Sequence, residues 1–211
     1  REGANALGFI CGTTHFTEDE VTVNFVLKVL KLLPPFVTPV LVTHYTDLSS
    51  IETLIKKTGI RTIQLQGDIS PEDIATLRKK FPEVKIIKAI HVTGEESLKC
   101  ALKYVHQVDA LLLDSRTEDR LGGTGLTHDW NISEKITSFI AKPVILAGGL
   151  NPDNVEKAIE KVKPFAVDVN SGMKAQDGFK SPEKVRAFIA KARRAFEKLV
   201  FSGNYLRWMD L

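Results

Sequence analysis

The sequence of 211 residues is poor in cysteine and contains no long apolar run. Its two cysteines, Cys11 and Cys100, are spaced neither like a disulfide framework nor like a metal-binding cluster. This favours a reduced, cytoplasmic setting and predicts no metal site. No apolar stretch reaches the roughly 20 residues that a transmembrane helix needs, so we expect no membrane partner.

The charge of the chain is also weak. With 29 Lys and Arg against 26 Asp and Glu, the net charge is +3, which is too mild to argue for a nucleic-acid partner. No low-complexity segment or linker divides the chain, and its length is ample for one hydrophobic core. We therefore expect a single domain over residues 1–211, present as a monomer or a homodimer.

Short apolar runs alternate with amphipathic stretches along the whole chain, which is typical of a parallel sheet with helical connections. The runs predict strands at Ala6–Cys11, Val40–Thr43, Thr62–Leu65, Lys85–Val92, Ala110–Asp114, Val144–Ala147 and Phe165–Val169. The amphipathic stretches predict helices at Glu18–Leu33, Leu48–Lys57, Ser70–Lys80, Glu95–Val105, Asn131–Ile140 and Ser181–Leu199, and one more that is capped by Asn151.

These segments make seven βα units, whereas a closed (β/α)8 barrel needs eight strands. The chain is therefore either an open doubly wound sheet or a barrel whose first strand is absent from this sequence. The opening residues, Arg1–Asn5, resemble the end of a helix that leads into a strand. We accordingly expect about 20 further residues before Arg1, enough for a strand and most of a helix.

Glycine follows each of the last two predicted strands. Gly148–Gly149 and Ser171–Gly172 leave backbone N–H groups accessible and allow a ligand to approach closely. In (β/α)8 barrels the loops after the last two strands commonly bind phosphate. A single Gly-Gly pair is more often a tight turn, but two such loops on successive units favour a phosphate site.

Several motifs resemble the phosphoribosylanthranilate isomerase family of tryptophan biosynthesis. They are GANALGF near the start, IQLQGD at 63–68, LLLDS at 111–115, GGTGLTHDW at 122–130, PVILAGGLNPDNVEKAI at 143–159 and VDVNSGMK at 167–174. The resemblance covers essentially the whole chain and implies a (β/α)8 barrel. It also implies an Amadori rearrangement of an aminoaldose to an aminoketose, without metal or cofactor.

The resemblance places Asp114 as the general acid that protonates the ribose ring oxygen. The preceding apolar residues, Leu111–Leu113, could raise the pKa of its carboxyl by desolvation. An aspartate at a strand end can instead be a simple loop cap. The general base of the family is a cysteine in the first strand, which we expect upstream of Arg1. Cys11 is the second candidate for the base, although a cysteine at the end of a strand is more often a small buried hydrophobic residue.

The resemblance also implies which residues bind a phosphorylated substrate: Gln64, Gly123, Gly148, Gly149, Asp168, Ser171 and Gly172. The loop after the first visible strand lacks the arginine that family members use for the anthranilate carboxylate, and His15 lies there instead. The prediction is a phosphoribosylanthranilate isomerase. The alternatives are an isomerase of another phosphosugar and a non-catalytic binder of phosphoribosyl ligands.

Overall fold

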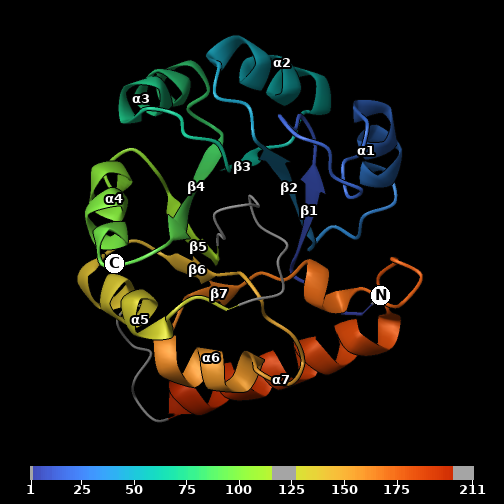
Figure 1. Cartoon of the computed structure of the whole chain (residues 1–211). Coiled ribbons are helices and arrows are strands. Elements are labelled where there is room, and N and C mark those ends of the chain that lie inside the picture. The colour runs from blue at the N-terminus through green and yellow to red at the C-terminus, as the bar shows by residue number, and fades with distance from the viewer. Residues whose placement is uncertain (1, 116–126, 202–211) are drawn as a thin grey trace. The chain divides into compact units, whose positions relative to one another are not determined.

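The computed structural model of the chain describes residues 2–115 and 127–201. Within them, seven strands alternate with seven α-helices (Figure 1). The strands are β1 Ala6–Ile10, β2 Thr38–Thr43, β3 Thr62–Leu65, β4 Lys85–Val92, β5 Ala110–Ser115, β6 Val144–Leu146 and β7 Ala166–Val167. The helices are α1 Val23–Leu30, α2 Leu48–Thr58, α3 Pro71–Lys80, α4 Glu96–Tyr104, α5 Trp130–Phe139, α6 Val155–Val162 and α7 Pro182–Phe201, with a 3₁₀ turn η1 at Ser171–Met173.

The strands form one sheet in chain order, β1 to β7, and the pairs β1–β2, β2–β3, β3–β4 and β6–β7 are parallel. This confirms the parallel α/β fold expected from the alternating pattern. The chain divides into an N-terminal unit (residues 4–89 and 103–111) and a C-terminal unit (residues 1–3, 90–102 and 112–211). Strands β4 and β5 contribute residues to both units, and the expectation of a single domain over 1–211 stays a prediction.

In the N-terminal unit, α1, α2 and α3 lie on the same side of strands β1, β2 and β3 (Figure 1). Side chains from both layers are excluded from solvent, including Leu41 of β2 and Ile63 of β3 on the sheet and Ile51 and Ile74 on the helices, all at 0% exposure. Burial of side chains of this size contributes about 1.5–3 kcal/mol each. The apolar stripe of each helix is therefore what fixes it on the sheet.

Local capping residues fix the start of α3 and the end of α2 in this unit. The Ser70 hydroxyl accepts a hydrogen bond from the Asp73 N–H (3.0 Å) and caps α3. Gly59 ends α2 with a left-handed backbone, at φ 68°. The predicted start of the first helix at Glu18 is wrong, because Val21 N–H donates to the Ile10 carbonyl (2.8 Å) and holds this segment against β1. The helix begins only after Thr22, whose side chain accepts from Phe25 N–H.

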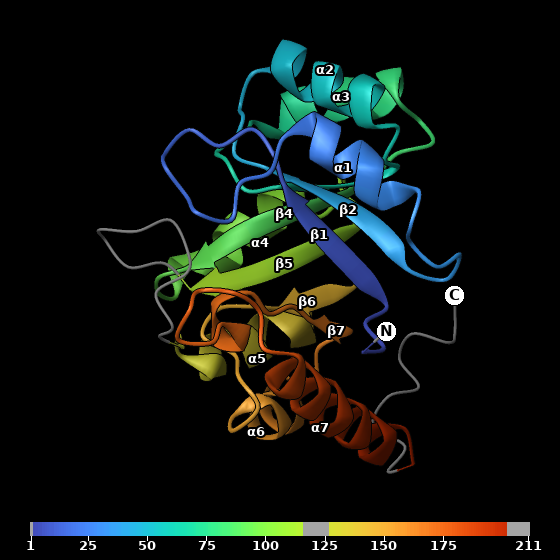
Figure 2. The same ribbon diagram turned by 90° about the vertical axis from the view of Figure 1, so that its right-hand side faces the viewer.

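In the C-terminal unit, α5 packs beside α6 and α6 beside α7 (Figure 2). Val144 and Leu146 of β6 are fully buried, as are Val155 and Ile159 of α6. Lys184 N–H donates to the Ser181 hydroxyl (3.2 Å), which confirms the predicted start of the last helix. No helix within the described ranges is both long and apolar enough to cross a membrane.

The C-terminal unit corrects two expectations. Asn151 is not the cap of α6: its side chain accepts from Asp153 N–H (2.8 Å) in a turn, and Asn154 occupies the capping position. The predicted buried strand Phe165–Val169 is reduced to the two half-buried residues of β7, and Phe165 is 48% exposed. The shortening follows from the partner strand, because β6 has three residues and pairs with only two residues of β7.

Candidate active site

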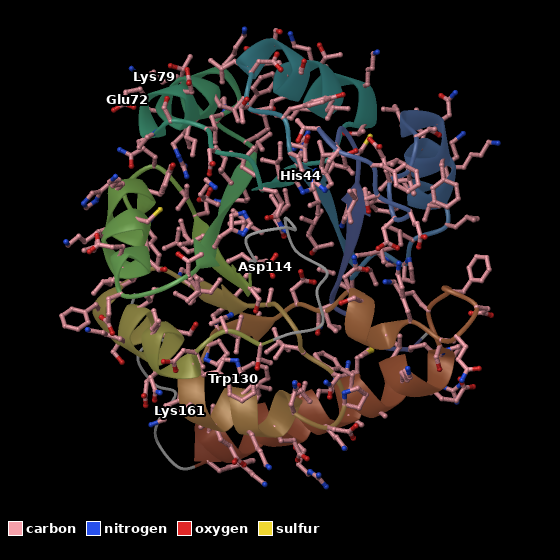
Figure 3. The ribbon with its side chains drawn as sticks, viewed as in Figure 1. His44, Glu72, Lys79, Asp114, Trp130 and Lys161 are labelled. Atoms are coloured by element: carbon pink, nitrogen blue, oxygen red, sulfur yellow. The ribbon has the colours of Figure 1, made fainter. Side chains whose placement is uncertain are left out.

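Asp114 lies at the carboxyl end of β5, where the apolar part of the strand stops (Figure 3). The three leucines before it are almost completely buried, and Asp114 itself is half-buried. Desolvation, the larger cause, and the nearby Asp168 carboxylate together raise the pKa of the Asp114 carboxyl from 3.8 to about 6. A hydrogen bond from the Ser115 backbone N–H acts in the opposite direction. Asp114 can therefore hold a proton close to neutral pH.

Asp168 directly follows β7, and its N–H donates to the Leu146 carbonyl of β6 (2.9 Å). Surrounding protein atoms raise the pKa of its carboxyl by desolvation, whereas the Val169 N–H and the Lys180 ammonium lower it. Asp168 is nevertheless exposed, and water therefore moderates this desolvation. Two carboxyl groups that repel each other near a cation are a common arrangement in acid–base sites.

The glycine loop after β6 is shaped by close backbone contacts. Gly148 and Gly149 both have left-handed backbones, at φ 82° and 65°. A Cβ atom added to Gly148 would collide with the Ser115 side chain and backbone nitrogen. The loop therefore runs directly over the end of β5, and only glycine satisfies both the dihedral angle and the contact.

The loop after β7 is packed just as tightly. A Cβ atom on Gly172 would collide with the Leu150 carbonyl oxygen, so this loop lies against the loop after β6. In the described part of the chain, the N–H groups of Gly149, Ser171 and Gly172 donate to no other residue. The two loops thus present backbone donors that are available to an anion.

A partly buried hydrogen-bond network at Ser115, the residue after Asp114, was not predicted from the sequence. The His128 ring lies between two serines, with Nδ1 at 2.9 Å from the Ser115 hydroxyl and Nε2 at 2.5 Å from the Ser133 hydroxyl. The His128 backbone N–H also donates to the Ser115 hydroxyl (3.1 Å). The only signal in the sequence was the HDW triplet that ends the GGTGLTHDW motif.

The structure thus brings Asp114, Asp168, Gly148, Gly149 and Gly172 together in the C-terminal unit, with Ser171 in the same loop as Gly172. Gly123 lies outside the described residues. Gln64 is a buried residue of β3 in the N-terminal unit, at 6% exposure.

Cys11 also belongs to the N-terminal unit, where it is 5% exposed. Desolvation raises the pKa of its thiol, and the Glu20 carboxylate raises it further. Glu20 accepts hydrogen bonds from the N–H groups of Gly12 and Thr13, both at 3.0 Å. Among the described residues, no group of three or more His, Cys, Asp or Glu side chains is arranged to hold a metal ion.

Comparisons with known proteins agree on one family. A family model described as N-(5′-phosphoribosyl)anthranilate (PRA) isomerase matches residues 3–191. The chain is 41% identical over 199 residues to N-(5′-phosphoribosyl)anthranilate isomerase 2 of Methanosarcina mazei, covering 93% of this chain and 88% of that protein.

Solved structures give the same result. A phosphoribosyl anthranilate isomerase from Thermotoga maritima matches with a TM-score of 0.79 and 31% identity, over 92% of this chain and 90% of that chain. A second match is a phosphoribosyl anthranilate isomerase in complex with reduced 1-(o-carboxyphenylamino)-1-deoxyribulose 5-phosphate. Its TM-score is 0.76 and its identity 29%, over 92% of this chain and 89% of that chain.

Proposed function

The chain belongs to the N-(5′-phosphoribosyl)anthranilate isomerase family and is an aldose–ketose isomerase of tryptophan biosynthesis, and we propose that Asp114 is the general acid of its reaction. The observation that carries this assignment is the raised pKa of the Asp114 carboxyl, about 6, at the end of a buried strand. A general acid works best when its pKa lies near the working pH. The carboxyl ends of parallel strands are also where (β/α) enzymes place their catalytic groups.

In the proposed mechanism, Asp114 donates its proton to the ribose ring oxygen of the substrate. The bond between that oxygen and the anomeric carbon breaks, and the ring opens to a protonated imine. A base then removes the proton from the adjacent carbon and forms an enolamine. Loss of the enol proton and protonation of the former anomeric carbon give the ketone, so hydrogen moves from the second carbon to the first. The neighbouring Asp168 helps to keep Asp114 protonated until it reacts.

We place the substrate phosphate on the two glycine loops. The N–H groups of Gly149, Ser171 and Gly172 have no acceptor in the described part of the chain, which supports an anion site there. Inorganic phosphate should shift the amide NMR signals of these three residues. Gly59, a helix-capping glycine whose φ is positive like that of Gly149, serves as the control. Equal shifts at Gly59, or no shifts at the three loop residues, would refute this phosphate site.

Cys11 is a poor candidate for the base, because a thiolate base needs an accessible setting and a lowered pKa. Here the thiol is buried and its pKa is raised. The expectation of a base cysteine upstream of Arg1 stays a prediction. We further propose a cytoplasmic location, which the free thiols of Cys11 and Cys100 support. Absence of a cofactor and the choice between monomer and homodimer also stay predictions.

The test of the assignment is turnover of N-(5-phosphoribosyl)anthranilate, followed by chromatography, in wild type and in Asp114→Asn. General acid catalysis contributes about 10²–10⁴-fold, so the variant should lose at least about a hundredfold in kcat. Asp153→Asn removes a carboxylate whose side chain is 94% exposed and should keep wild-type turnover. Near-normal turnover in Asp114→Asn would remove Asp114 from the mechanism.

A further inference from the structure

His128 connects the end of β5 to the start of α5. It precedes Asp129, whose side chain accepts from Asn131 N–H (2.9 Å) and caps α5. Its own ring bridges Ser115, the last residue of β5, and Ser133, in the second turn of α5. Both serines are buried, at 5% and 0% exposure. Three polar side chains placed together at this depth are costly unless every hydrogen bond is made.

The geometry suits the neutral imidazole. A neutral ring has one donor and one acceptor nitrogen, and each serine hydroxyl can take either role, so both neutral tautomers form both bonds. A charged ring would require both serines to accept. Desolvation lowers the pKa of His128 to about 4, although the Asp129 carboxylate opposes this. His128 is therefore uncharged across the neutral pH range.

Ser115 passes this restraint on to the proposed acid. Its backbone N–H hydrogen-bonds to the Asp114 carboxylate. Its side chain and nitrogen also lie against Gly148 so closely that no Cβ atom fits there. If Ser115 rotates or shifts, the orientation of Asp114 and the path of the glycine loop must change with it.

We propose that His128 is a positioning residue that holds Ser115 between β5 and α5, and thereby orients Asp114 and supports the glycine loop after β6. This proposal rests on the assignment of Asp114 as the general acid. In this proposal His128 acts through Ser115 and not on the substrate. Its contribution comes from fixing Ser115 through two hydrogen bonds, one from the ring and one from the backbone N–H.

The competing explanation is that His128 only fills space at the start of α5. The variant His128→Phe separates the two, because it keeps an aromatic ring of similar size and loses both ring nitrogens. His128→Asn places its amide oxygen and nitrogen close to the position of Nδ1, and so retains a partner for Ser115 but not for Ser133. Ile136→Val trims the fully buried face of the same helix and controls for a general loss of stability.

In His128→Phe, kcat should fall by about 10–100-fold, with a smaller change in KM, since misplacing a reacting group costs up to about that factor. The alkaline limb of the pH profile of kcat, where activity falls as Asp114 loses its proton, should also move to higher pH. The bond from Ser115 N–H lowers the pKa of Asp114, so weakening that bond raises it. His128→Asn should recover most of kcat and return the alkaline limb to its wild-type pH. Ile136→Val should leave the limb at its wild-type pH. A merely space-filling role predicts an unmoved limb in all three variants.

Wild-type kcat and an unmoved limb in His128→Phe would overturn the proposal. So would an equal loss in His128→Asn and His128→Phe. If His128→Phe does not fold, Ser115→Ala breaks the link from the other side. It deletes the hydroxyl that meets both the His128 ring and the His128 backbone N–H, and it should show a comparable loss of kcat and the same shift of the alkaline limb to higher pH. Asp114→Asn is measured in parallel. Near-normal turnover in that variant would refute the assignment of Asp114 as the acid, and with it the positioning role of His128. If Asp114→Asn is inactive and His128→Phe turns over at the wild-type rate, only the positioning role of His128 is refuted.

Discussion

Replacing Asp114 with asparagine should stabilise the protein at the same time as it inactivates it. The pKa of the Asp114 carboxyl is higher in the folded chain, at about 6, than its ordinary value of 3.8. The folded state therefore prefers the protonated acid. Relative to the unfolded chain, this contribution is fully present below pH 3.8 and is lost as the pH rises through about 6.

The size of the effect follows from the pKa. A rise of about two units corresponds to about 3 kcal/mol, since each unit is worth about 1.4 kcal/mol. Asp114 is only half-buried, so we expect about 2 kcal/mol after allowing for solvent screening. Asparagine is neutral at every pH and avoids the cost of ionisation. In a chain of this length the melting temperature at pH 8 should rise by roughly 4–8 °C.

The assay is urea unfolding, with thermal melting in parallel, at pH 4 and pH 8. Asp114→Asn should be more stable than wild type at pH 8, and the two should differ little at pH 4. Asp153→Asn, on the exposed surface, should show no such dependence on pH. A stability difference of the same size at both pH values, or a less stable Asp114→Asn at pH 8, would refute the raised pKa on which the acid assignment depends.

Two further predictions concern the neighbours of the acid. Asp168→Asn removes a carboxylate that raises the pKa of Asp114, so the alkaline limb of kcat/KM should move to lower pH. The shift should be less than about one pH unit, because desolvation is the larger cause of the raised pKa. A shift to higher pH would contradict the interaction between Asp168 and Asp114. Gly148→Ala combines a left-handed backbone with a collision against Ser115 and should cost more than about 2 kcal/mol in urea unfolding, whereas Gly59→Ala, with open space around it, should cost only about 1–2 kcal/mol from its dihedral angle.

The bounds of β3 and β4 were predictable from runs of β-branched and aliphatic residues between turn residues. β3 and β4 have the predicted bounds, because each run is buried and lies between polar or glycine-bearing connections. The start of α1 was not predictable from its own periodicity. Val21 fits an apolar helical stripe, yet its N–H is bonded to the Ile10 carbonyl of β1. That contact depends on tertiary structure, which a local pattern does not contain.

The candidate site was predictable to the extent that its chemistry depends on residue type and position along a strand. Asp114 follows three leucines, and the glycines follow strands β6 and β7, so both could be found by inspection. His128 could not, because its role depends on Ser115, 13 positions earlier, and Ser133, five positions later. No periodicity links these three residues. Only the fold shows that the histidine lies between the two hydroxyls.

Desolvation raises the pKa of Asp114 and lowers the pKa of His128, and both shifts favour the neutral form of the side chain. Desolvation keeps the acid protonated to about pH 6, and it keeps the imidazole neutral down to about pH 4. A positive charge beside Asp114 would favour its carboxylate and lower its pKa. A neutral histidine instead supplies hydrogen bonds to Ser115 without adding that charge. Lysine or arginine at position 128 could also bond to the serine, but it would reduce the protonated fraction of the acid at the pH where the enzyme must donate a proton.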